Sequence, residues 1–186
     1  MPTPPWLVAR FTRRRPVYAE YSADRRNVVG GPTLEEQKQA FAAAFVTRAE
    51  FASRYEGYTN AASFVDALLA NVQQASGVDL GSQRDSLIGR YNTGADQAES
   101  RTLVLRDVTE SAAVRDANYN KAFVLVEYFG YLRRNPDRQG YDFWLNVLNT
   151  GDPGNYRGMV CSFIASAEYQ HRFSLIVTHS NAECGQ

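Results

Sequence analysis

The chain has 186 residues, in which 20 Lys and Arg balance 20 Asp and Glu, and 44% of the residues are hydrophobic. This length suffices for one sizeable core or two small ones, so size alone requires no disulfide or metal. The neutral charge balance excludes a global attraction to nucleic acid or an anionic membrane, and the absence of a long apolar run excludes a membrane-spanning helix.

Residues 1–32 are predicted to form an irregular N-terminal arm with one short turn around residues 22–26. Prolines stand at positions 2, 4, 5 and 16, and the arm ends at Gly-Gly-Pro. The arm lacks the apolar stretch of a secretory signal, so either the protein is not exported by that route or the sequence is a processed or excised piece. Nucleic acid or a membrane are alternative partners, but we expect docking on the protein's own domain or a neighbouring subunit through Trp6, Phe11, Arg13, Arg14 and Arg15.

Residues 33–173 are predicted to form an all-α bundle of about seven helices. The first begins at a capping box, in which Thr33 and Glu36 satisfy backbone N–H groups, and Asn135-Pro136 is expected to end the fifth. Residues 174–186 form a C-terminal tail, in which residues 174–178 are the one strand-like stretch. The predicted helices span about 33–57, 60–74, 81–91, 96–111, 113–134, 141–148 and 155–173.

Internal repetition is the sharpest signal in the chain, and it predicts helix-turn-helix units at about 33–57, 60–111 and 113–173. The stretch DSLIGRYNTG at 85–94 matches DFWLNVLNTG at 142–151, position by position. The stretch FVTRAEF at 45–51 matches FIASAEY at 163–169. Glu50 and Glu168 are therefore equivalent repeat positions, which explains their similarity better than a pair of catalytic carboxylates would.

The two cysteines, Cys161 and Cys184, allow one intramolecular pair. Two arrangements stay open. We favour a buried free thiol in the last helix and an exposed one in the tail. The alternative is a disulfide that staples the tail to the helix, which would indicate an oxidising compartment. The only histidines are His171 and His179, and no metal-ligand spacing occurs, so we expect no metal site.

The run LRRNPDRQGYDFW at 132–144, followed by NTG at 149–151 and FIASAEY at 163–169, resembles the bacterial domain of unknown function 4214. The family's arginine, aspartate, glycine and tryptophan fall on Arg134, Asp137, Gly140 and Trp144. A related turn occurs in the linker polypeptides of phycobilisomes. The middle repeat lacks the Pro-Asp and the Trp. The resemblance implies the tail region of a multi-module secreted protein and carries no recognised catalytic residues.

The turn from Asn135 to Gly140 is the one candidate ligand site in the chain. Arg134, Asp137, Gly140, Tyr141 and Trp144 could bind a sugar or a cation, with the aromatic rings stacking on a sugar. The competing interpretation, which we favour, is a turn held by an Arg-Asp hydrogen-bonded pair beside a core tryptophan. No cofactor is expected.

We expect a non-enzymatic structural or interaction module of an extracellular or cell-surface assembly. Its termini would dock on neighbouring subunits, through the arm and through Leu175, Ile176 and Val177 of the tail. The partners would be further copies of the chain or other cell-surface proteins, and not nucleic acid. The alternatives are a carbohydrate or surface-ligand binding module that uses the Asn135 to Gly140 turn, an intracellular linker, or an enzyme.

Overall fold

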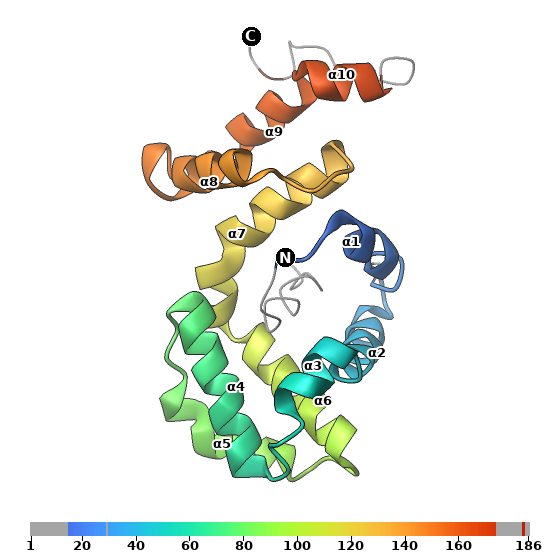
Figure 1. The fold of residues 1–186 in the computed structure, drawn as a ribbon, viewed down its shortest axis with the longest axis vertical. Helices are drawn as coiled ribbons and strands as arrows, with labels where there is room; N and C mark the ends of the chain where they lie inside the picture. Colours follow the sequence, from blue (N-terminus) through green and yellow to red (C-terminus); the bar gives the residue numbers. More distant parts are fainter. Residues whose placement is uncertain (1–14, 29, 174–183, 185–186) are drawn as a thin grey trace. The chain divides into compact units, whose positions relative to one another are not determined.

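Helices form the regular structure of residues 15–28, 30–173 and Cys184, the part of the chain that the computed structural model describes (Figure 1). The predicted all-α class is confirmed, with no strand in these residues. The α-helices there are α1 Tyr18–Asp24, α2 Leu34–Val46, α3 Ala49–Tyr55, α4 Ala61–Ser76, α5 Arg84–Tyr91, α6 Gln97–Glu110, α7 Ala112–Tyr131, α8 Arg138–Asn146, α9 Tyr156–Ile164 and α10 Ala167–Phe173. A 3₁₀ turn, η2 (Gly81–Gln83), precedes α5, and a π-helical turn, η3 (Val147–Gly151), follows α8.

The chain divides into two units at a boundary between Asn118 and Tyr119, which lies inside α7. The repeat domain predicted over residues 33–173 includes this boundary. Each unit has its own buried core, because large apolar side chains on either side of the boundary are fully buried. Within the described residues, no helix is both long enough and apolar enough to cross a bilayer.

The N-terminal arm is more regular than predicted, because residues 18–24 form the helix α1 rather than a short turn. Pro16 is buried just before the helix. The Glu20 carboxylate accepts a hydrogen bond from the Val17 N–H at 3.1 Å, which satisfies a backbone donor at the helix start. The prolines and arginines of residues 1–32 suggested irregular structure, so the helix that begins two residues after Pro16 was not predicted. The predicted docking residues Trp6, Phe11, Arg13 and Arg14 lie outside the described residues.

Two helices that were predicted to be continuous are broken. These two breaks, together with the additional helix α1, raise the number of α-helices in the described residues from the predicted seven to ten. Thr47 and Arg48 separate α2 from α3, and the Arg48 N–H donates to the Phe45 carbonyl at 3.1 Å. Ala165 and Ser166 separate α9 from α10 in the same way, where the Ser166 N–H donates to the Phe163 carbonyl at 3.1 Å. The two breaks fall at equivalent repeat positions, so the matching sequences adopt matching backbone structures.

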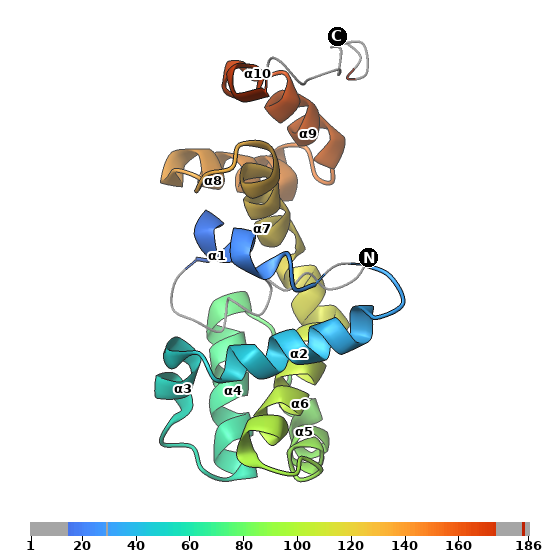
Figure 2. The same cartoon turned by 90° about the vertical axis from the view of Figure 1, so that its right-hand side faces the viewer.

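In the first unit, α5 packs against α4 and α6, and α2 lies against α6 (Figure 2). An aromatic cluster contributes to the buried core of this unit. Ring centroids of Tyr55 and Phe64 lie 5.3 Å apart, and those of Phe64 and Tyr91 lie 5.6 Å apart. Arg101 of α6 is buried against this cluster, with its guanidinium 5.2 Å from the Phe64 ring centre. Its Nη2 donates to the carbonyls of Tyr55 and Tyr58, at 2.8 and 2.9 Å, so it satisfies acceptors at the end of α3.

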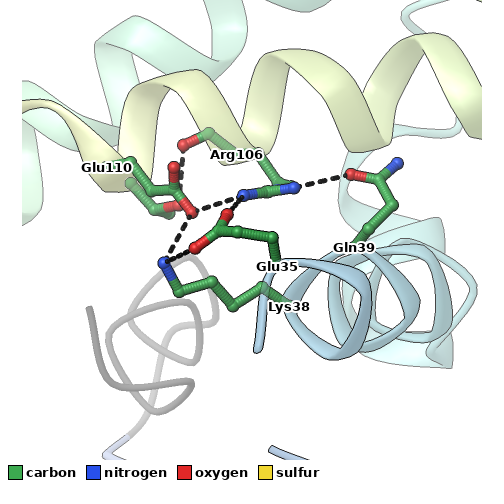
Figure 3. A network of polar contacts seen from close by, with 6 residues as sticks. Glu35, Lys38, Gln39, Arg106 and Glu110 are labelled. Carbon is green, nitrogen blue, oxygen red and sulfur yellow. Dashed lines mark hydrogen bonds and ion pairs between the residues drawn. The ribbon is translucent and has the colours of Figure 1, made fainter. Parts of the chain in front are cut away.

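A charged network joins α2 to α6 in the same unit (Figure 3). Arg106 of α6 donates to Glu35 at 2.7 Å, to Glu110 at 2.8 Å and to Gln39 at 3.1 Å. Lys38 also lies 2.8 Å from Glu35. Hydrogen bonds from Lys38 and Arg106 lower the pKa of Glu35. Each carboxylate of this network faces a cation, so we interpret the network as a link between the two helices rather than as a reactive site.

Candidate functional site

The turn between α7 and α8, which contains most of the predicted site, begins where α7 ends. The helix ends at Tyr131, earlier than the proline at 136 suggested. Arg133 adopts a left-handed backbone conformation with φ of 49°, and the Leu132 N–H donates to the Tyr128 carbonyl at 3.1 Å. A non-glycine residue in this conformation costs roughly 1–2 kcal/mol. The Arg133 guanidinium packs over the Phe173 ring at 4.8 Å, a contact that offsets part of this cost.

Asp137 is the N-cap of α8. Its Oδ1 accepts a hydrogen bond from the Gly140 N–H at 2.7 Å, and this bond is the main cause that lowers the pKa of Asp137. Gly140 is needed at its position because a Cβ there would collide with the Tyr128 hydroxyl of α7. The Pro-Asp and Gly of the family pattern therefore start α8 and allow it to approach α7 closely.

Arg134 connects the turn to α10 through a bidentate ion pair. Its Nε lies 2.6 Å from Glu168 Oε1, and its Nη2 lies 2.9 Å from Glu168 Oε2. The guanidinium also lies 5.1 Å from the Tyr128 ring centre, and its Nη1 donates to the Asn135 carbonyl at 3.0 Å. Asp137, the partner that the sequence suggested, is a weaker contact at 3.6 Å. The hydrogen bond from Arg134 lowers the pKa of Glu168 and raises that of Arg134.

The two aromatic residues of the predicted site both contact other parts of this unit. Tyr141 is 4% exposed, and its hydroxyl donates to the Lys121 carbonyl at 3.4 Å. Trp144 packs against Phe163 of α9 with a centroid distance of 5.8 Å, and Phe163 packs edge-on against Tyr128 at 4.9 Å. The structure thus brings the candidate site residues around one turn, but it engages each of them in a contact within this unit.

Asn120 of α7 is a residue that sequence reasoning missed. Its Nδ2 donates to the Leu148 carbonyl at 3.1 Å and to Asn149 Oδ1 at 2.8 Å, and its Oδ1 accepts from the Tyr156 hydroxyl at 2.7 Å. Asn120 therefore fixes the Asn-Thr-Gly segment after α8 and the start of α9. The available signal was an asparagine in the middle of a long helix, where its intrinsic propensity is poor.

Glu127 of α7 is a second missed residue. It is 6% exposed, and its Oε2 is buried without a hydrogen-bond partner. Burial raises the pKa of Glu127 from 4.5 to about 7. Tyr131 is the titratable neighbour, since its own pKa is raised by burial and by the charge of Glu127. The signal in the sequence was a single acidic residue in the apolar run AFVLVEYFG at 122–130.

Phe143 of α8 is the third missed residue, and it is the most exposed large hydrophobic residue in the part of the chain that is described. Its side chain is 59% exposed, and its ring lies edge-on to Trp144 at a centroid distance of 5.2 Å. Ser86 occupies the equivalent position of the middle repeat. Because the repeat tolerates serine here, the fold does not require an aromatic side chain at this position.

Cys161 of α9 and Cys184 form a disulfide in the structure, and both residues are partly exposed. Of the two arrangements that the sequence left open, the structure has the one that we did not favour. Periodicity showed that Cys161 lies on a helix, but it could not show that the tail returns to that helix. Leu175, Ile176 and Val177, together with the strand-like stretch 174–178, lie outside the described residues.

The described residues hold no group of three or more His, Cys, Asp or Glu side chains that could bind a metal ion. Glu168 is paired with Arg134 and also lies 3.3 Å from Arg172, whereas Glu50 belongs to α3 of the other unit. The arrangement around the α7–α8 turn can hold helices in place, and we identify no step of chemistry in it.

We expect substitution of Arg134 by Ala to lower the free energy of unfolding by about 1–2 kcal/mol, since a bidentate charged pair is lost but both side chains keep some solvent exposure. Arg138→Ala is the matched control, because Arg138 is 87% exposed and lies 3.6 Å from Asp142. Urea unfolding and hydrogen exchange of α10 measure the effect. Equal stability of the two variants would contradict the role assigned to Arg134.

Raising the pH through 7 is expected to destabilise the wild-type chain, because Glu127 binds its proton more tightly in the folded state than in the unfolded state. The stabilising effect of the proton is present at low pH and is lost as the carboxyl ionises. Glu127→Gln should remove this dependence, with a gain of at most about 3 kcal/mol at pH 8.5 and little difference at pH 4.5.

Thermal unfolding at several pH values measures the effect of Glu127, with the exposed Glu56→Gln as the control. If the wild type and Glu127→Gln lose stability in parallel between pH 5.5 and pH 8.5, Glu127 is not the titrating group.

Comparison with known proteins gives one match to a protein family. No curated protein and no solved structure matches the chain. A family model matches residues 110–173, which include α7 to α10 and the α7–α8 turn. The resemblance carried by Arg134, Asp137, Gly140 and Trp144 is thereby confirmed: residues 110–173 match the model of the family described as a domain of unknown function (DUF4214).

Proposed function

We propose that the chain is a non-enzymatic structural and interaction module of an extracellular or cell-surface assembly, in which its termini dock on neighbouring copies or on other cell-surface proteins. The observation that carries the proposal is the engagement of the family's characteristic side chains within the fold. Arg134 holds Glu168, Asp137 caps α8, and Trp144 packs on Phe163. The engagement of these side chains in such contacts supports a scaffold role, because it leaves them less available to bind and turn over a substrate.

The disulfide between Cys161 and Cys184 supports the extracellular part of the proposal. Disulfides persist in oxidising compartments and are rare where cytosolic thiol buffers keep cysteines reduced. The bond closes a loop with a sequence separation of 23 residues. It therefore keeps the C-terminal end of the chain attached to α9, as a docking segment of a secreted module requires.

The decisive experiment measures the mass of the purified chain in solution by light scattering coupled to gel filtration. Wild type is expected to form a defined oligomer. Trp6→Ser/Phe11→Ser in the arm, or Leu175→Ser/Ile176→Ser/Val177→Ser in the tail, should reduce it to a monomer with unchanged helical content. Tyr58→Ser is the control, because Tyr58 is an exposed aromatic residue far in sequence from both terminal segments. The same masses are measured again in the presence of a reductant.

A wild-type chain that stays monomeric at its highest soluble concentration, with and without reductant, would exclude self-assembly. Retention of the oligomer in both terminal variants would exclude docking through the termini and would direct attention to another surface.

A carbohydrate-binding module is a second candidate, and the exposure of Phe143 favours it. An exposed ring beside Trp144 offers an apolar face to a sugar, and the exposed pair Arg138 and Asp142 offers hydrogen-bonding groups on the same helix. The site then lies on α8 rather than in the Asn135 to Gly140 turn. Binding of immobilised polysaccharides should be lost in Phe143→Ala and kept in Tyr58→Ala, with unchanged thermal midpoints. Equal binding by both variants would reject this candidate.

A further inference from the structure

We propose that residues 16–55 form a second, diverged copy of the structural unit that residues 136–173 form, and that an ion pair between Asp24 and Arg48 positions its first helix as Trp144 positions α8. The family match covers residues 110–173 and does not include this segment. The inference is independent of the proposed function, because it rests on internal comparison of two parts of the chain.

The two segments begin alike. Pro16 precedes the residue before α1, and Pro136 precedes the residue before α8, so each helix starts two residues after a proline. The fourth position of each helix is a tyrosine, Tyr21 in α1 and Tyr141 in α8. The sequence similarity between the segments is weak, but both helices begin at the same distance from a proline and have a tyrosine at the same helical position.

The helix starts are stabilised by the two halves of one capping arrangement. In α8, the N-cap Asp137 accepts a hydrogen bond from the N–H of the third helical residue, Gly140, at 2.7 Å. In α1, the third helical residue Glu20 accepts from the N–H of the N-cap Val17 at 3.1 Å. These two bonds occur together in a capping box. Each copy has one of these two bonds. Val17 stands at the position of Asp137 and cannot accept a hydrogen bond through its side chain, but the bond from Glu20 still stabilises the start of α1.

The two segments also end alike. In each of them a helix stops one residue after a buried phenylalanine, Phe45 in α2 and Phe163 in α9. Two residues then break the helix, and a second helix of 7 residues follows, α3 in one case and α10 in the other. The order of elements and the spacing at both ends therefore agree between the copies.

The seventh residue of the first helix differs in chemistry between the two copies, but in both copies it makes a contact with the residues around the later helix break. Trp144 is the seventh residue of α8, and its indole ring packs on Phe163 with a centroid distance of 5.8 Å. The seventh residue of α1 is Asp24, which binds Arg48 at 2.7 and 3.1 Å.

The Arg48 guanidinium lies 5.2 Å from the ring centre of Phe45, the counterpart of Phe163. A flat guanidinium held by Asp24 thus covers the phenylalanine that the indole covers in the other copy. Arg48 itself stands where the other copy has Ser166, the second residue of the break. One aromatic contact has been replaced by a pair of residues at two equivalent positions.

The first test transfers the ion pair into the family-matched copy of the full-length chain. Trp144→Asp alone should speed amide exchange of α8 by about tenfold, the change that corresponds to loss of one well-packed contact. When Ser166→Arg is added to Trp144→Asp, the logarithm of the α8 exchange rate should return at least a third of the way to the wild-type value. If the double variant exchanges as fast as Trp144→Asp or faster, positions 144 and 166 are not the counterparts of 24 and 48 and the proposal fails.

The second test examines the first copy and remains informative if Trp144→Asp does not fold. Asp24→Asn and Arg48→Met should each speed exchange of α1 by about fivefold, and the double variant should be no worse than either single variant, because the same contact is lost. Arg25→Ser, at an exposed neighbouring position, is the control.

Salt gives the third measurement, on the wild-type chain alone. At 1 M NaCl, screening should speed exchange of α1 more than exchange of α8, because an ion pair is the contact of Asp24 in α1, whereas the apolar contact of Trp144 in α8 is not screened. Equal salt responses of the two helices, or additive effects of Asp24→Asn and Arg48→Met, would overturn the assignment of the pair.

Discussion

The bidentate pair between Arg134 and Glu168 is the interaction on which the family-matched domain depends. It joins the turn after α7 to the first residues of α10, two points that are 34 positions apart in sequence. Tyr128 lies against the same guanidinium and also sets how closely α8 can approach, through Gly140. The positions of α7, α8 and α10 are therefore linked through the Arg134 guanidinium. This group makes hydrogen bonds to Glu168 and Asn135 along its edges, and its face packs on Tyr128.

This dependence changes how the family pattern is understood. A run of arginine, aspartate, glycine, tyrosine and tryptophan in one short segment has the composition of a binding site, but the geometry uses these residues to start one helix and to secure two others. Side chains with specific chemistry are needed wherever a turn must be fixed without a large core. Phe143, which lies outside this pattern, is a residue whose side chain the fold leaves at the surface.

Much of the helical structure was predictable, because apolar residues such as Phe64 and Leu68 recur at helical spacing. Both of these residues are buried, as that spacing implies. The breaks at Arg48 and Ser166 were not predictable from periodicity, since apolar spacing continues through them. For the candidate site, the sequence identified Arg134 but suggested Asp137 as its ion-pair partner. A partner close in sequence is easier to infer than Glu168, which is 34 positions away. The pairing of Cys161 with Cys184 depends on chain reversal, which no local pattern encodes.

The disulfide has a consequence for the response of the chain to proteases. Because Cys184 is covalently attached to α9, a single cut anywhere between Cys161 and Cys184 would leave the two fragments joined. Cleavage there would produce a nicked molecule of almost unchanged mass, which separates into two pieces only after reduction. In a compartment that contains secreted proteases, the module could be processed in this segment and still keep its C-terminal end.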